Sequence, residues 1–297
     1  GQYVKTLFVR LVQSGNNVQA LIDNASPHTN GTAYLAANQL GQDMDSVANV
    51  VYSMALATSA GAGGYGVARL DIAGKATLSS LGSFTGSLRL TTETEGGTGQ
   101  YVFSRSIPGT LEITGGFGSV SSVVNNGLII LNQSTDSTLA GAISGSGGVF
   151  KLGAGNTTFS GAATYTGETT VAAGRLTLQD VYASATHTIL SGATLALDVA
   201  SGDRSFATST FRGAGTLLKT GAGRALWTNS VATFALSSGA LIDVQDGVFA
   251  GNSNEVWTNN FSDLNVASGA TVAVADGAFR VDALSGAGSI TVGGAGG

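Results

Sequence analysis

Cysteine and charge are scarce in this chain. None of its 297 residues is cysteine, and charged residues make up only 10% of it. The lack of cysteine excludes disulfides, thiolate metal sites and a cysteine nucleophile. The formal net charge is −5, and the few basic residues form no cluster. Because phosphate binding needs a clustered positive face, we expect no nucleic-acid partner.

Long hydrophobic runs are also missing. No uninterrupted apolar stretch approaches the roughly 20 residues of a membrane-spanning helix, so we expect no direct membrane span in this segment. The first residues lack the charged and apolar regions of a signal peptide. We therefore expect either that a signal was removed before residue 1 or that the chain is a fragment.

Glycine is abundant where proline is rare. The chain has 45 Gly and 2 Pro, and 43% of its residues are hydrophobic. A disordered chain would carry more charge and fewer large apolar residues. Glycine among alternating Val, Leu, Ile and Thr is instead typical of many short strands joined by tight turns.

A glycine-rich frame, G-x-G-x-φ-x-K-x-G-A-G with φ apolar, occurs twice in full. The segments 143–160 and 211–228 align without a gap at an offset of 68 residues. A third copy opens at Leu284, has Val292 in place of the lysine, and stops partway. We therefore expect the natural protein to continue beyond residue 297.

A shorter repeat relates 238–249 to 268–279 at an offset of 30 residues. Glycine turns followed by alternating apolar residues, recurring about every 20 residues, predict a solenoid of stacked coils. The offset of 68 fits three coils, and the offset of 30 fits one coil with a short loop. Alternation would point Leu, Val, Ile and Phe inward.

The segment 142–178, AISGSGGVFKLGAGNTTFSGAATYTGETTVAAGRLTL, resembles the autotransporter-associated β-strand repeat. The matching residues are Lys151, Gly153, Gly155, Phe159, Ser160, Gly161, Tyr165, Gly167, Thr169, Val171, Gly174 and Leu176. The resemblance implies an autotransporter passenger, that is, a right-handed parallel β-helix exported through an outer membrane. In that family the repeat is a scaffold, so it bears on fold and location more than on activity.

The N-terminal region differs from the rest, so we predict a cap region over 1–107 and a parallel β-helix over 108–297. Within the cap, 3–12 looks like a strand and strands resume at 67–72. Apolar residues in 33–56 follow helical spacing. This helix would either cover open coil edges or dock on a neighbouring subunit.

No constellation for catalysis is evident. The two histidines are His28, in a polar loop, and His187, which alternation places on the outer side of a strand. Lys151 and Lys219 occupy equivalent repeat positions, which indicates a structural or solvated role. Gly61, Gly63 and Gly66 fit a dinucleotide motif only in letters, because a predicted helix precedes them and a strand follows.

An enzyme of the β-helix class would need clustered carboxylates. The pairs Asp243 with Asp246 and Asp276 with Asp282 are candidates, but Asp246 and Asp276 each precede a glycine and fit turns. We expect Trp227 and Trp257 to stack within the coils. We predict no catalytic, cofactor-binding or metal-binding residue and no cofactor.

The sequence thus predicts an all-β parallel β-helix with a structural or adhesive role: a stalk, adhesin or filament subunit at the surface of a Gram-negative bacterium or secreted by it. Its partners would be further copies of itself, joined end to end or laterally, or ligands on host surfaces. A toxin-like passenger and a carbohydrate-active β-helix enzyme are the alternatives.

Overall fold

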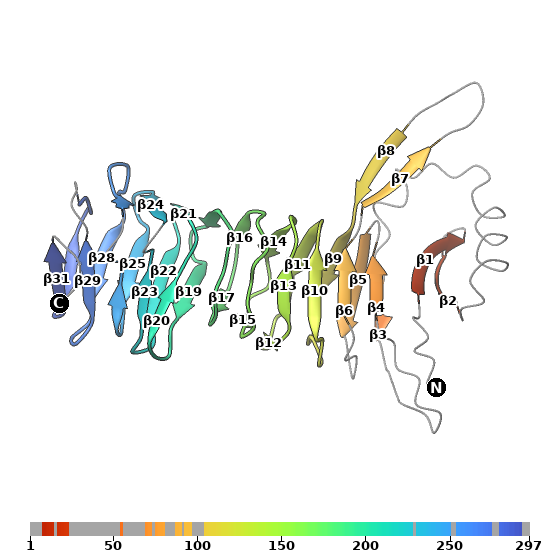
Figure 1. Cartoon of the computed structure of the whole chain (residues 1–297), viewed down its shortest axis with the longest axis horizontal. Helices are drawn as coiled ribbons and strands as arrows, with labels where there is room; N and C mark the ends of the chain where they lie inside the picture. Colours follow the sequence, from red (N-terminus) through yellow and green to blue (C-terminus); the bar gives the residue numbers. More distant parts are fainter. Residues whose placement is uncertain are drawn as a thin grey trace. The chain divides into compact units, whose positions relative to one another are not determined.

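The computed structural model describes residues 8–14, 17–23, 54–55, 69–72, 75–80, 87–90, 92–96, 104–227, 230–250, 254–274 and 279–292. All regular structure in these residues is β-strand (Figure 1). The chain divides into two compact units, 1–130 and 131–297. The all-β, parallel β-helical fold predicted from the sequence is confirmed.

Within its described residues, the first unit contains parallel ladders and two antiparallel pairs. The antiparallel pairs are β1 (Phe8–Ser14) with β2 (Asn17–Asp23), and β7 (Thr92–Gly96) with β8 (Ser104–Pro108). The parallel ladders join β4 (Arg69–Ile72), β6 (Ser87–Leu90) and β10 (Ser122–Asn125), and β3 (Met54–Ala55), β5 (Lys75–Ser80) and β9 (Thr110–Ile113). β11 (Leu128–Leu131) follows β9 in the second ladder.

The predicted elements of the first hundred residues are partly tested. The strand expected at 67–72 is present as β4, and the one expected at 3–12 is present from Phe8 as β1. Most of the helix expected over 33–56 lies outside the described residues. At its end the expectation is wrong, because Met54–Ala55 forms β3 and pairs in parallel with β5. Pairing with a neighbouring strand therefore overrides the helical spacing there.

The second unit is a stack of coils with three parallel sheets. The first sheet contains β14 (Gly148–Lys151), β16 (Thr169–Val171), β18 (Thr186–Ile189), β21 (Ser209–Gly213), β24 (Val231–Leu236) and β27 (Asn254–Val256). The second contains β12 (Ser137–Leu139), β15 (Asn156–Phe159), β17 (Arg175–Leu178), β19 (Thr194–Asp198), β22 (Thr216–Thr220), β25 (Leu241–Val244), β28 (Asp263–Val266) and β30 (Leu284–Gly286).

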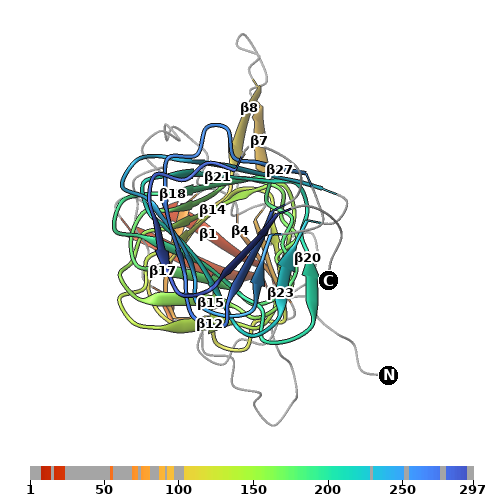
Figure 2. The same cartoon turned by 90° about the vertical axis from the view of Figure 1, so that its left-hand side faces the viewer.

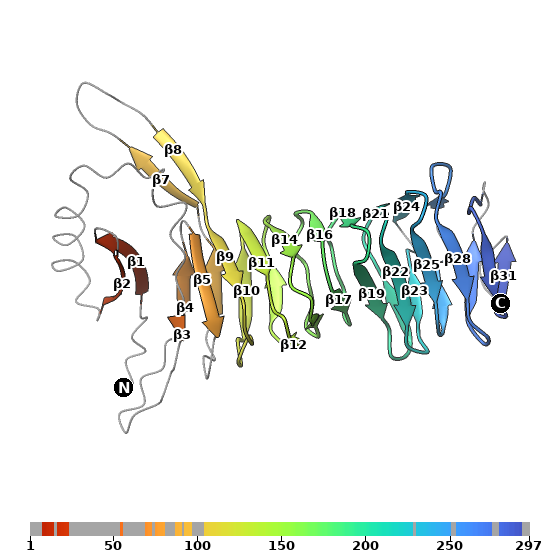
Figure 3. The same ribbon diagram turned by 180° about the vertical axis from the view of Figure 1, so that it is seen from behind.

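The third sheet contains β20 (Asp203–Ser205), β23 (Arg224–Leu226), β26 (Val248–Phe249), β29 (Thr271–Val274) and β31 (Ser289–Val292). In earlier coils, β13 (Ala142–Ser144) is continued by single bridges from Ile143 to Ala163 and on to Tyr182. Seen along the stack, the coils of this unit superimpose around a common interior (Figure 2). From behind, β19, β22, β25 and β28 stand side by side (Figure 3).

The core of the second unit follows from strand alternation. Strands such as β14, β15, β18 and β25 alternate strictly between partly exposed and buried residues, and most of the buried members are apolar. Inward columns then form in register, as in Leu176, Leu195, Leu217, Ile242 and Leu264 of the second sheet, all fully buried. One coil cannot shield its apolar face alone, but each shields its neighbour when stacked.

The glycine frame marks a corner, that is, the turn between two faces of a coil, and does not mark a whole coil. Its first glycine, at Gly145, Gly213 and Gly286, has φ of 108°, 104° and 101°, a region that side chains disfavour. The strand after this turn is β14 in the first sheet, β22 in the second and β31 in the third. Successive copies of the frame therefore occupy successive faces.

The offsets contain the expected three coils and one coil, but each also contains one further face that was not expected. Val149 stacks in register over Thr169, His187 and Phe211, three coils in one sheet, whereas its repeat partner Leu217 lies on the next face. In the shorter repeat, Leu241 belongs to β25, but Thr271 stacks on Val248 of β26. Each offset equals whole coils plus one face, because all faces use the same turn-and-strand pattern.

Candidate functional surface

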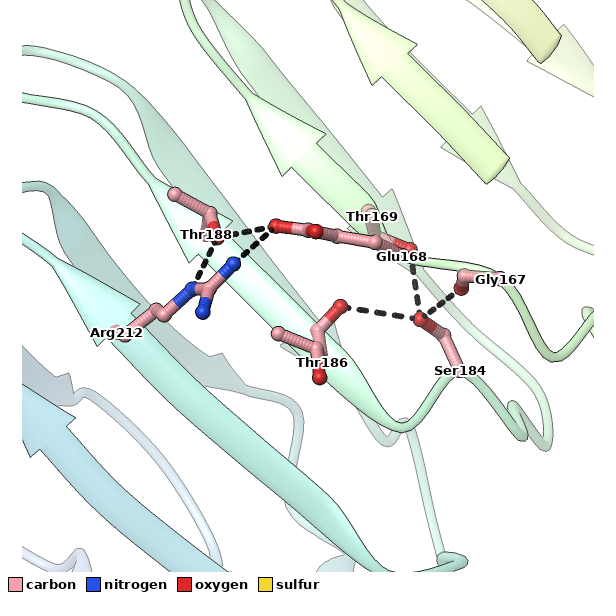
Figure 4. Close-up of polar contacts among 7 residues, drawn as sticks. All are labelled: Gly167, Glu168, Thr169, Ser184, Thr186, Thr188 and Arg212. Atoms are coloured by element: carbon pink, nitrogen blue, oxygen red, sulfur yellow. Dashed lines mark hydrogen bonds and ion pairs between the residues drawn. The ribbon is translucent and has the colours of Figure 1, made fainter. Parts of the chain in front are cut away.

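The outer side of the first sheet carries a charged ladder across three coils (Figure 4). Arg212 donates from Nη2 to Oε1 of Glu168 at 2.8 Å and from Nε to Oγ1 of Thr188 at 2.7 Å. The Thr188 hydroxyl donates to the same Glu168 oxygen at 2.5 Å. This hydroxyl, together with Arg212, lowers the pKa of Glu168. Because Glu168 and Arg212 are exposed and Thr188 is partly exposed, the ladder stabilises the fold only modestly.

Behind this ladder, a polar cluster is buried inside the same coils. The hydroxyl groups of Tyr165 and Thr169 are 2.6 Å apart, and Thr169 donates to Ser184 at 3.1 Å. Ser184 in turn donates to the Gly167 carbonyl at 2.7 Å (Figure 4). Burial raises the pKa of Tyr165. Tyr165, Gly167 and Thr169 are the Y-x-G-x-T residues of the repeat. Their hydrogen bonds to one another and to Ser184 hold the turn that precedes β16.

Polar rows also run along the second sheet. Asp198 accepts from Gln179 Nε2 at 2.8 Å and from the Thr220 hydroxyl at 2.9 Å, which links three coils. Asp243 accepts from Asn265 Nδ2 at 2.7 Å, one coil further on. Sequence reasoning missed these rows, because the partners are separated by coil lengths that vary. The strand register identifies these rows, because it shows which residues of adjacent coils are neighbours.

In the first of the carboxylate pairs proposed for a carbohydrate-active site, both carboxylates have structural partners. Asp243 belongs to the row described above. Asp246 Oδ1 accepts from the Gly247 amide at 2.8 Å, in a turn where Gly247 has φ of 65°. The turn predicted at Asp246 is therefore present. Asp276 lies outside the described residues, and the Asp282 amide pairs with the Ser262 carbonyl.

The outward placement expected for His187 is wrong. His187 is fully buried on β18, and Thr186 and Thr188 are the outward members of that strand. Its ring stacks on Phe211 with centroids 5.0 Å apart and meets the edge of Tyr182 at 5.1 Å. The expected phase was off by one residue, because His187 lies on the same side of the strand as the buried Ile189. His28 lies outside the described residues, as do Gly61, Gly63 and Gly66.

Lys151 and Lys219 have a structural role, and both are fully buried. The Lys219 ammonium donates to the carbonyls of Thr220 and Gly221, each at 2.7 Å, and to that of Asp246 at 3.2 Å. Lys151 donates to the Gly153 carbonyl. Burial lowers the pKa of both lysines, that of Lys219 to about 8. The frame lysine is thus a clamp on the backbone of the glycine turn, and a solvated role is excluded.

Trp227 and Trp257 stack in the core as predicted. Both are fully buried, and Trp257 lies over Phe234 with centroids 4.0 Å apart. Trp227 contacts Phe211 and Phe234 edge-on. These rings are therefore unavailable as surface contacts for sugar or protein.

The described residues contain no group of three or more His, Asp or Glu side chains arranged to hold a metal ion. They also contain no helix with the length and apolarity needed to cross a bilayer.

Comparison with known families supports the resemblance noted from the sequence. The model of the passenger-associated transport repeat matches residues 149–178. This segment runs from β14 through β17 and includes the lysine clamp and the Tyr165 network. The chain fits an autotransporter passenger that carries this repeat. Searches of curated proteins and of solved structures found no significant match to this passenger.

Proposed function

We propose that this passenger is a structural or adhesive protein at the surface of a Gram-negative bacterium or released from it. The match to the passenger repeat within a parallel β-helix is the observation that carries the proposal. Passengers of this kind are exported, so the association supports a secreted or surface location. A stalk, an adhesin and a filament subunit are the forms that this role would take.

The pairing of polar and charged side chains with one another and with turns supports a mechanical role. In the second unit the charged and polar groups described above satisfy one another across coils or clamp turns, as with Glu168 and Arg212 or Lys219 and Asp246. Such ladders fix the register of a rigid scaffold. We propose that the protein acts through its surfaces without catalysis, and that its partners are further copies of itself or ligands on host surfaces.

The test compares bacteria that carry the full-length gene with a deletion strain complemented by the wild-type gene or by Phe234→Asp. Protease shaving of intact cells, or collection of the medium, should release wild-type protein. Attachment to surfaces or between cells should fall in the deletion strain. Wild type should restore it, and Phe234→Asp, which places a charge in the core, should not.

Other outcomes would contradict the proposal. Retention of the protein inside the cell would overturn the location. Unchanged attachment, combined with membrane-dependent oligomers of the purified protein, would favour a toxin-like passenger. Unchanged attachment with depolymerisation of a polysaccharide would favour an enzyme.

Axial or lateral arrays in electron micrographs of extracellular material would identify the filament form.

A further inference from the structure

His187 occupies an unusual place in the core column of the first sheet. The column runs in register through Val149, Thr169, His187, Phe211 and Phe234. On one side of His187 lies the hydrogen-bonded network of Thr169, and on the other lies the stack of aromatic rings. The imidazole is thus the one member of this column that can take up a proton.

The surroundings of the ring suit a neutral imidazole. His187 has no exposed surface, and neither ring nitrogen has a hydrogen-bond partner of good geometry. Its faces and edges meet Phe211 and Tyr182 at about van der Waals separation, with centroids 5.0 and 5.1 Å apart. A charge placed here would lose its hydration without gaining a paired counter-ion.

The titratable groups around His187 do not provide that counter-ion. Before β16 and β18 lie Tyr165 and Tyr182, both fully buried phenols. Next to β16 lies Glu168, which acts on the ring from the outer side and is already paired with Arg212 of β21. Proton uptake at His187 would therefore favour conformations in which this coil separates from its neighbours.

We propose that His187 makes the coil of β18 an acid-sensitive joint, at which mildly acidic medium loosens the β-helix. Burial lowers the pKa of His187 to about 4, although the Ser184 backbone and Glu168 oppose the shift. In an opened coil, the pKa of His187 would return to about 6.5. A group whose folded pKa is depressed in this way stabilises the fold fully above pH 6.5, and that contribution is lost as pH falls toward 4.

The test measures hydrogen-exchange protection factors of the full chain by mass spectrometry, at pH 7.5 and pH 5.0. Peptides covering 182–213 should lose protection about 30-fold in the wild type, as expected for one proton taken up on opening. Working at pH 5.0 keeps most carboxylates ionised. His187→Phe, which extends the Phe211 and Phe234 stack, should abolish the loss. His28→Gln, at the other histidine of the chain, should retain it.

Two results would overturn this proposal. One is an equal pH-dependent loss of protection in His187→Phe and in the wild type. The other comes from the wild type alone and holds even if the variant misfolds: an NMR titration in which the buried imidazole protonates near pH 6.5 in the folded protein. Both are independent of the proposed surface role, which concerns location and attachment.

Discussion

Single residues at the corners decide how each coil closes. Gly213 has φ of 104°, and a Cβ atom built there would lie 2.1 Å from the carbonyl oxygen of Ile189. This is far closer than two such atoms can approach, and it involves backbone of the coil before. The glycine is therefore needed both for its conformation and for the close stacking of coils.

We expect Gly213→Ala to lower the free energy of unfolding by at least about 2 kcal/mol, because strain and a backbone clash add. Gly116→Ala is the matched control, since nothing lies within 4 Å of its Cβ position and its φ is not positive. It should change stability by less than about 0.5 kcal/mol. Urea denaturation followed by circular dichroism measures both, and equal effects would contradict this account of the corner.

The two frame lysines allow a second comparison at this scale. Lys219→Met keeps the aliphatic stem but removes the ammonium donor from three carbonyls, of which that of Thr220 keeps the Val199 amide, and should cost about 2–3 kcal/mol. Lys151→Met removes one described contact of this kind, to Gly153, and should cost less. The same denaturation measurement ranks the two variants. Equal or reversed losses would show that the carbonyl clamp does not stabilise the turn.

Elements in the second unit are held together by side-chain columns as well as by ladders. Phe234 of β24 contacts the rings of Phe211 and Trp257, one coil away on either side, and those of Trp227 and Phe249, which lie less than one coil away along the chain. Its burial is complete. Aromatic contacts of this geometry add to the hydrophobic term and orient each coil on the next.

Phe234→Ala should therefore cost about 3–5 kcal/mol, as is usual for a large buried ring. Phe261→Ala is its control, because Phe261 is 41% exposed and packs mainly under Arg280, whose guanidinium lies 3.9 Å from the ring centroid. That control should cost about 1 kcal/mol. Unfolding monitored by tryptophan fluorescence reports on Trp227 and Trp257, both of which contact Phe234. A loss of 1 kcal/mol or less in Phe234→Ala would contradict the importance of the column.

How far the sequence predicts these elements depends on the level considered. Alternation and glycine turns predicted many strands and inward residues such as Leu195 and Leu217 correctly, since both patterns are local. The offsets of 68 and 30 contain the expected three coils and one coil, but the extra face in each was missed, because a corner looks the same on each face. His187 was placed on the wrong side, although alternation puts it on the same side of β18 as the buried Ile189.

The whole-molecule prediction depended on the resemblance to the passenger repeat, and the match at 149–178 supports it. The outer ladder of Glu168 and Arg212 was not predictable in the same way. Its members are 44 residues apart, so only the register of β16, β18 and β21 brings them together. The sequence therefore allows the repeating scaffold to be recognised, but it does not predict which side chains meet on the surface.

In-register parallel stacking is the claim on which the rest depends, and paired cysteines test it in a chain that has none of its own. Thr170 and Thr188 are register partners on the outer side of adjacent coils, whereas Arg212 is the partner of Thr188 one coil further. Adjacent parallel strands lie about 4.8 Å apart, which is within the range of a disulfide. Strands two coils apart lie at about twice that distance, which is out of range. Under mild oxidation, Thr170→Cys with Thr188→Cys should cross-link, and Thr170→Cys with Arg212→Cys should not. Cross-linking of the second pair without the first would contradict the parallel β-helix.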